Sequence, residues 1–385
     1  MNPASTLNQH AGAQPAGARH TGAARSPGGP PPPAAARSPR RWAVTATVAV
    51  ALAAGAGLAV AAPWLVDPYT TSLLARTLVF GLVAASVAVL TGIAGLPTLG
   101  QTAPFAAGAY TCAVLSLHTG AVGVVSLLAG AAAGALLAAL TAPLVVYARG
   151  VVALMITLAI GELAVVAAGR WKSVTGGTDG LAGMPSVPAS WGLPVLGDDR
   201  ARYLYALAAV AVVVGAVVLA LRTPAGALLR GCRDDERRMR ASGHPVTGYL
   251  AVALVAAGAV AGVAGSLLIT VQQYVSPADF GFDVAALLLL GVVIGGAGSV
   301  GGAFAGTALV IAGRDWLSGL LPGHAPVLLG GLFVLAAYAF PQGVAARSGL
   351  PGLARRSVSG GLISGRRAGW LISGRRAGAG DRGRP

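Results

Sequence analysis

Residues 203–270 read YLYALAAVAVVVGAVVLALRTPAGALLRGCRDDERRMRASGHPVTGYLAVALVAAGAVAGVAGSLLIT. Two apolar runs, 203–221 and 249–270, enclose a charged island, 222–249, that holds six arginines and three acids. Each apolar run is long enough to cross the hydrocarbon core of a bilayer as a helix. Arginine-rich segments between such helices are typical of the cytosolic side. The stretch therefore predicts an all-α, polytopic membrane protein with this island in the cytosol.

The charged island carries the signals of a short helix of its own. Thr223 suits an N-cap, Pro224 suits the first helical position, and Gly243 offers a stop. Pairs of opposite charge with i,i+4 spacing are Arg230–Asp234, Asp234–Arg238 and Glu236–Arg240. One side of this helix would carry Leu228, Cys232 and Met239, with Asp235 among them. Such a helix favours a docking surface, and the alternative is a solvated connector that satisfies the positive-inside rule.

Composition assigns the chain to membrane proteins. Of its 385 residues, 55% are hydrophobic and 10% charged, and the mean hydropathy is +0.73. The net charge of +15 would fit nucleic acid, but its distribution argues otherwise. Five arginines and no acid precede Trp42, and nine arginines follow Pro341 against the single acid Asp381. The basic excess thus lies in the tails and in the island, as expected of cytosolic segments, and no nucleic-acid partner is predicted.

Three parts follow from this pattern. The basic tails, 1–41 and 342–385, are predicted to be disordered and cytosolic, and the membrane part spans 42–341 with a cytosolic segment at 222–248. Two cytosolic tails require an even number of crossings, and about ten result if the cluster GGAGSVGG (295–302) is a turn. An eight-span arrangement with re-entrant segments is the alternative. The irregular loop 170–202 then lies outside the cytosol. The apolar runs are 42–66, 70–90, 103–117, 121–147, 151–169, 203–221, 249–270, 284–313 and 326–340.

The first apolar run also fits a targeting segment. Arg40 and Arg41 precede it, and AVAAP at 59–63 offers a cleavage site for a signal peptidase. The run 42–66 is longer than the apolar core of most signal peptides, which favours a signal-anchor helix. Small-residue spacing at Gly291, Gly295, Gly298, Gly302 and Gly306 predicts close helix contacts elsewhere in the membrane part.

The sequence lacks the usual catalytic motifs. The single lysine, Lys172, follows no glycine-rich run, so the chain has no Walker A loop for ATP. The five histidines are scattered without metal-ligand spacing, so no metal or cofactor is predicted. Glu162 is the clear intramembrane acid, and it is either a functional group or a packing group bonded to a neighbouring helix. We therefore expect a transport protein and no enzyme.

Four stretches resemble a known family. ALMITLAIGELAVVAAGRWKSVTGGTDGLAGMP (153–185) is similar to the "TLAxxE…W…TGGxDGLxGIP" run of the permease subunits of branched-chain amino acid ABC importers, the LivM type. The stretches 92–115, 222–249 and 274–309 resemble further segments of that family in the expected order, and together they cover about residues 70–340.

The resemblance implies the ABC importer permease fold, multiple spans in a bacterial plasma membrane, and a set of partners. These partners are a second, LivH-like permease, two cytosolic ATPase subunits and an extracytoplasmic solute-binding protein, besides membrane lipids. The segment 222–248 would be the coupling segment for the ATPase, and its site residues would be Thr223, Gly226, Arg230, Arg233, Asp234, Asp235, Glu236 and Gly243. The translocation path or the loop for the binding protein would involve Gln101, Glu162, Thr175, Gly176, Gly177, Asp179 and Gly180.

This chain departs from the family pattern at several positions. Gln101 and Pro104 stand where the family tends to have His and Ala, which bears on the solute. Cys232 replaces a common Ile, and the arginines at 237, 238 and 240 replace a mostly neutral stretch. Branched-chain amino acids are the expected solutes, and urea or short amides are the alternative within the family. An ion-coupled carrier, a membrane enzyme and a scaffold or channel are less favoured alternatives.

Overall fold

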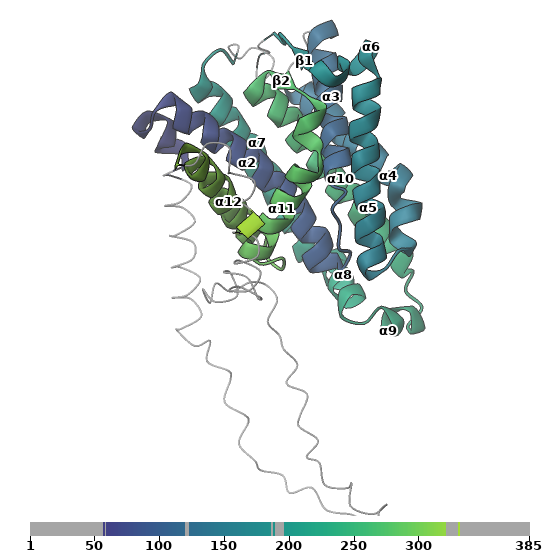
Figure 1. Ribbon diagram of the computed structural model, residues 1–385. Coiled ribbons are helices and arrows are strands. Elements are labelled where there is room, and N and C mark those ends of the chain that lie inside the picture. The colour runs from purple at the N-terminus through teal and green to yellow at the C-terminus, as the bar shows by residue number, and fades with distance from the viewer. Residues whose placement is uncertain are drawn as a thin grey trace, which may run out of the picture. The chain divides into compact units, whose positions relative to one another are not determined.

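A computed structural model describes residues 57, 59–119, 123–185, 188, 196–320 and 330–331. These residues lie almost entirely in the second of two compact units, Leu58–Pro385, and within that unit the described residues form a bundle of helices (Figure 1). Six stretches of the described residues are long and apolar enough to cross a membrane. They are Pro68–Ala94, Gly123–Tyr147, Gly150–Arg170, Asp199–Arg222, Val246–Gln272 and Pro277–Gly295. The predicted class, a polytopic helical membrane protein, is confirmed.

The helices follow the apolar runs closely, because each run is bounded by charged, proline or glycine residues. The long helices are α2 (Pro68–Ala88), α3 (Thr102–Thr119), α4 (Gly123–Tyr147), α5 (Gly150–Arg170), α7 (Asp199–Arg222), α10 (Val246–Gln272), α11 (Phe282–Gly295) and α12 (Val300–Leu320). The predicted turn at 295–302 is present, since α11 ends and α12 begins within it. The count of ten spans stays a prediction, because the runs 42–66 and 326–340 lie largely outside the described residues.

Glycines bring the helices of the core into backbone contact. On α10, a side chain at Gly262 would overlap the carbonyl oxygen of Gly130 on α4, and one at Gly265 would overlap that of Phe105 on α3. The predicted contact between α11 and α12 also forms, since Gly306 lies against the carbonyl oxygen of Gly291. Such contacts let helix backbones approach closely in lipid, where packing drives association.

Helix α2 is continued and then interrupted near the end of the bundle that carries the short helices α8 (Pro224–Asp234) and α9 (Glu236–Ala241). It passes into a π-helix, η1 (Val89–Ala94), and Gly95 then takes the left-handed conformation at φ 77°. The chain runs without regular structure to α3, and Leu96 and Thr98 in this interruption are buried. Irregular backbone at membrane depth is tolerated where protein covers it, and π-helical turns are frequent at functional sites.

Two helices lie at the surface of the bundle. Only 22% of the span window of α5 and 11% of that of α7 is buried within the chain, against 72% for the windows that contain α2 and α10. Helices this apolar do not face water. The outer faces of α5 and α7 are therefore available to lipid or to another membrane subunit.

Candidate functional site

The charged end of the bundle is built from two short helices, where the sequence predicted one. They are α8 (Pro224–Asp234) and α9 (Glu236–Ala241), and Asp235 separates them (Figure 1). The carboxylate of Asp235 accepts a hydrogen bond from the backbone N–H of Arg238 at 3.0 Å, which caps the second helix. Thr223 has the extended N-cap backbone, but its hydroxyl donates to the carbonyl of Ala220 at 2.6 Å instead of capping α8. The stop at Gly243 is as predicted, with φ 83°.

The break between α8 and α9 changes the predicted ion pairs. Glu236 and Arg240 pair at 2.7 Å as expected. Arg230–Asp234 and Asp234–Arg238 are not among the ion pairs of the described residues. The second cannot keep helical spacing because Asp235 is extended, with ψ 93°.

Glu236 instead connects the island to the loop between α4 and α5. Its Oε1 lies 2.5 Å from Nη2 of Arg149, the residue that precedes α5. Partial burial acts to raise the pKa of Glu236, but hydrogen bonds from Arg149 and Arg240 outweigh it and hold this pKa below its ordinary value of 4.5. The carboxylate is thus a charged anchor between two segments that are distant in sequence.

A second anchor ties α8 to the interrupted helix. The guanidinium of Arg233 donates to the carbonyl of Gly92 in η1, and a side chain at Gly95 would lie 3.1 Å from the Cα of Arg233. Cys232 is buried behind this contact, and burial raises the pKa of its thiol. Gly226 is buried, and a side chain at this position would overlap the carbonyl oxygen of Leu221. Motion of α8 would therefore be transmitted directly to the backbone of η1.

The remaining charges of the island face solvent. Asp234, Arg237 and Arg238 are exposed, and none of their side chains makes an ion pair within the described residues. This part of the island is an exposed, charged surface in the described part of the chain.

The glycine end lies at the opposite end of α5 (Figure 1). It comprises α6 (Lys172–Thr175), the 3-10 turn η2 (Gly177–Asp179) and strand β1 (Leu181–Ala182). β1 pairs antiparallel with β2 (Tyr274–Val275), in the register Leu181 opposite Val275. A second 3-10 turn, η3 (Pro277–Phe280), follows β2 and leads into α11. The motif TGGTDGL is thus joined to the motif YVSPADF by backbone pairing.

Glycine geometry fixes this end. Gly176, Gly177 and Gly180 all have positive φ, at 73°, 69° and 75°. A side chain at Gly180 would overlap the carbonyl oxygen of Val275, so only glycine allows the strand pairing. Thr175 is buried, and its hydroxyl lies 2.5 Å from the carbonyl oxygen of Ala168.

The backbone amides of the three glycines in this loop are occupied by hydrogen bonds within the loop and with α6. The amide of Gly176 donates to the carbonyl of Lys172 at 3.2 Å, and that of Gly180 to the carbonyl of Gly177 at 3.3 Å. The amide of Gly177 is directed to the hydroxyl of Thr175 at 3.4 Å. The exposed residues of the turn are Thr178 and Asp179. The backbone carbonyl oxygen of Asp179 accepts a hydrogen bond from the hydroxyl of Tyr274.

Comparison with known proteins assigns this arrangement to a family. The model of the branched-chain amino acid transport system / permease component matches residues 69–337. The chain belongs to this family. It is 30% identical over 313 residues to the high-affinity branched-chain amino acid transport system permease protein LivM of Escherichia coli strain K12, covering 74% of this chain and 72% of that protein. LivM of Salmonella typhimurium strain LT2 is also 30% identical, over 317 residues, with the same coverage. No solved structure matches.

In this permease, the interruption after η1 holds a buried polar cluster. Gln101 is 2% exposed, and its amide oxygen lies 3.5 Å from the hydroxyl of Ser86 on α2. Thr157 on α5 accepts a hydrogen bond from the amide of Leu99 at 3.1 Å. A cavity of about 20 Å³ among Thr98, Gln101 and Thr157 has room for one water molecule. The cluster joins α2, α3 and α5 at the interruption.

Glu162 lies five residues further along α5 than Thr157, on the face that the permease presents outward. Its side chain is half-buried, and no described residue forms a hydrogen bond or ion pair with it. Leu163 and Val166 beside it are 68% and 54% exposed. The packing alternative, a carboxylate bonded to a neighbouring helix, is not seen within the described part of the chain.

Several residues of these sites were not singled out by the sequence. Arg149 lies between the apolar runs 121–147 and 151–169, and Ser86 and Thr157 are small polar residues inside apolar runs. Arg76 is a cation within the apolar run 70–90, and acids alone are considered in the apolar runs from the sequence. With the amide of Gln272 turned so that its oxygen faces Arg76, Nε of Arg76 donates a hydrogen bond to this oxygen at 2.8 Å. A search for every polar residue inside an apolar run would have found three of the four.

Proposed function

We propose that this chain is the membrane-spanning permease subunit of an ATP-binding cassette importer for branched-chain amino acids, in a bacterial plasma membrane. One observation carries the proposal. A chain of this permease family presents an exposed charged surface at one end of the bundle and a glycine-built loop at the other. Hydrolysis of ATP is assigned to two separate cytosolic subunits, and solute delivery to an extracytoplasmic binding protein. A second, LivH-like permease would complete the membrane part.

The charged end is proposed to bind the ATPase. Asp234, Arg237 and Arg238 are exposed and have no partner among the described ion pairs, as a docking surface requires. Arg233 and Glu236 would then carry the movement of the ATPase to η1 and to the start of α5, because they contact Gly92 and Arg149. Alternating access would follow from this rigid-body displacement.

The translocation path is proposed to run along the outer face of α5, between this chain and the second permease. Glu162 would line or orient that path, and Gln101 would lie behind it. The half-buried carboxylate of Glu162 would obtain its hydrogen-bond partners from the second permease or from water in the path, since unpaired burial of a charge is costly.

Docking can be tested by reversing exposed charges. The double variant Arg237→Glu/Arg238→Glu, purified with its ATPase, binding protein and second permease, should lose solute-stimulated ATP hydrolysis while remaining folded. Arg200→Glu is the control, because Arg200 is also exposed but lies in the first turn of α7, at the end of that helix away from the island. Unchanged stimulation in the double variant would refute the docking surface.

Sidedness can be tested with single cysteines on the background lacking Cys112 and Cys232. Ala182→Cys at the glycine end should react with an impermeant thiol reagent in intact cells. Arg238→Cys should react only after permeabilisation. The reverse pattern would invert the proposed topology.

The solute can be tested by uptake into proteoliposomes that contain the complete importer. Leucine, isoleucine and valine should compete with labelled leucine, whereas urea and acetamide should not. Competition by urea or acetamide alone would favour the alternative solutes. Uptake that collapses with a protonophore at constant ATP would favour an ion-coupled carrier.

A further inference from the structure

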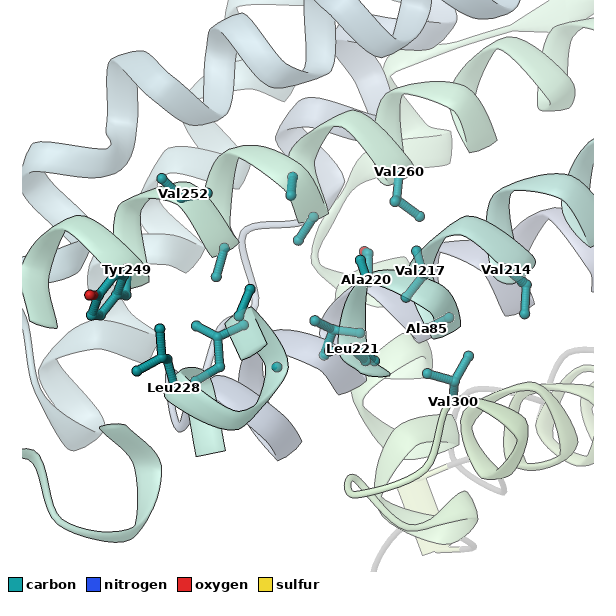
Figure 2. A pocket seen from close by; sticks show the side chains of 18 of the residues that line it. Ala85, Val214, Val217, Ala220, Leu221, Leu228, Tyr249, Val252, Val260 and Val300 are labelled. Carbon is teal, nitrogen blue, oxygen red and sulfur yellow. The ribbon is translucent and has the colours of Figure 1, made fainter. Parts of the chain in front are cut away.

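A cavity of about 280 Å³ lies between α2, α7, α8 and α10, next to the charged end (Figure 2). Its walls are aliphatic, and Figure 2 shows side chains from these helices directed toward the common space. The lining includes Val214, Val217, Ala220, Leu228, Val252 and Val260. The function proposed above makes no use of this cavity.

The cavity lies at the surface of the bundle. One wall is α7, the helix with only 11% of its span window buried. Val252 on the opposite wall is 69% exposed, and Ala220 is also exposed. Both walls belong to segments apolar enough to cross a membrane. The cavity is therefore accessible from the side of the bundle, at the depth of lipid.

The lining does not suit an amino acid. Among the described residues that line the cavity, Ser86 and Tyr249 alone have polar side chains. The hydroxyl of Ser86 donates to the carbonyl of Val83 at 2.6 Å, so it is already occupied. A zwitterion would leave both its carboxylate and its ammonium without partners, which is strongly unfavourable. A hydrocarbon chain would fill the same space at no such cost.

Two arginines lie next to the lining residue Leu221, on the side of the cavity formed by α8. Arg222 follows the lining residue Leu221, and Nη2 of Arg230 lies 3.4 Å from the carbonyl oxygen of Leu221. Neither arginine is paired with a carboxylate among the described residues. An aliphatic cavity with unpaired cations beside it matches an acyl chain joined to an anionic headgroup.

We propose that the cavity binds one anionic phospholipid, with an acyl chain between α7 and α10 and its phosphate on Arg222 and Arg230. Because Ala225, Gly226, Leu228 and Leu229 of α8 form part of the wall, the bound chain packs against the coupling segment itself. The site is independent of the transported solute, so it can be tested on the permease alone.

The acyl-chain half of the proposal is tested by photolabelling. The full-length chain is placed in phosphatidylcholine nanodiscs with a trace of phosphatidylglycerol that carries a diazirine in its acyl chain, and labelled peptides are identified by mass spectrometry. Labels should appear on α7, α8 and α10. Ala220→Phe fills the cavity and should lower them by about tenfold, a change of about 1.4 kcal/mol. Ala216→Phe is the matched control, because Ala216 is also exposed on α7 but does not line the cavity.

Equal labelling of these two variants would overturn the proposal. So would unlabelled wild-type peptides in this region, which would mean that protein, such as another segment of this chain, closes the cavity.

The headgroup half is tested by competition. Unlabelled phosphatidylglycerol should displace the probe from the wild type far better than phosphatidylcholine does. Arg222→Gln and Arg230→Gln should each reduce this preference about fivefold, while Arg237→Gln, exposed on α9, should leave it unchanged. A wild type that shows no preference for the anionic lipid, or an equal loss in Arg237→Gln, would overturn the assignment of the phosphate site.

Discussion

The two ends of this permease are held together by different means. At the charged end, side chains join distant segments: Arg233 reaches Gly92, and Glu236 reaches Arg149. At the glycine end, backbone meets backbone, and Gly180 lies directly on the carbonyl of Val275. Long side chains can exchange partners with little rearrangement, whereas a glycine contact has no such freedom. The charged end is thus suited to a coupling that moves, and the glycine end to a fixed platform.

The largest effect on this contrast is expected from the variant Gly180→Ala. The new methyl group would overlap the carbonyl oxygen of Val275, and the alanine would have to keep the left-handed φ of 75°. We therefore expect β1 to separate from β2. We expect a loss of about 3 kcal/mol or more in stability, together with loss of uptake. Thermal unfolding in detergent and uptake in proteoliposomes measure the two effects.

Gly183→Ala is the matched control for that variant. Gly183 has nearly the same φ, 76°, but nothing lies within 4 Å of the position of a side chain. It should cost only the strain of the left-handed conformation, about 1–2 kcal/mol. Equal losses at both positions would show that conformation alone, without the strand contact, makes the loop rigid.

The second test removes the anchor of α8. Arg233→Ala deletes the charged donor to the carbonyl of Gly92 and should cost about 1.5–3 kcal/mol. Uptake should fall more than ATP hydrolysis does, because the two are uncoupled when α8 no longer holds η1. Arg237→Ala should leave the melting temperature unchanged, and a normal ratio of uptake to hydrolysis in Arg233→Ala would contradict the coupling role.

Glu162 lies between the two ends and provides the third test. Glu162→Gln keeps the shape of the side chain and removes its charge. Uptake should continue at a rate reduced by less than about tenfold, or about 1.4 kcal/mol, and should remain driven by ATP. Complete loss of uptake with an intact fold would mean that the charge itself is essential to transport.

The smallest expected effect concerns the pair Arg149–Glu236. The pKa of Glu236 is lowered in the folded state, so its contribution to stability is present above the unfolded pKa and is lost as the pH falls through the folded value. A double-mutant cycle with Arg149→Gln and Glu236→Gln should give about 0.2–1 kcal/mol at pH 7. This coupling should disappear on acidification below pH 4.5, which thermal unfolding across pH would detect.

The sequence predicted local features well and long-range ones poorly. The turn between α11 and α12 and the helix stop at Gly243 followed from glycine chemistry within a few residues. The single helix expected in the island was wrong at Asp235, because capping by its own carboxylate competes with helix continuation.

The long-range partners of Glu236 and Arg233 could not be predicted from the sequence. Arg149 is 87 residues from Glu236, and Gly92 is 141 residues from Arg233. No spacing in the sequence encodes such contacts, since they arise only when the helices pack. The π-helical end of α2 was missed for a related reason, because the run 70–90 reads as continuous apolar helix.

The glycine contacts of α10 have a mechanical consequence. Where Gly262 meets Gly130 and Gly265 meets Phe105, no side chain lies between the backbones that could change rotamer as the helices shift. Helices α3, α4 and α10 must therefore travel as one block during a transport cycle. The strain of each cycle then falls on α5 and α7, whose span windows are the least buried among the six apolar spans of the described residues.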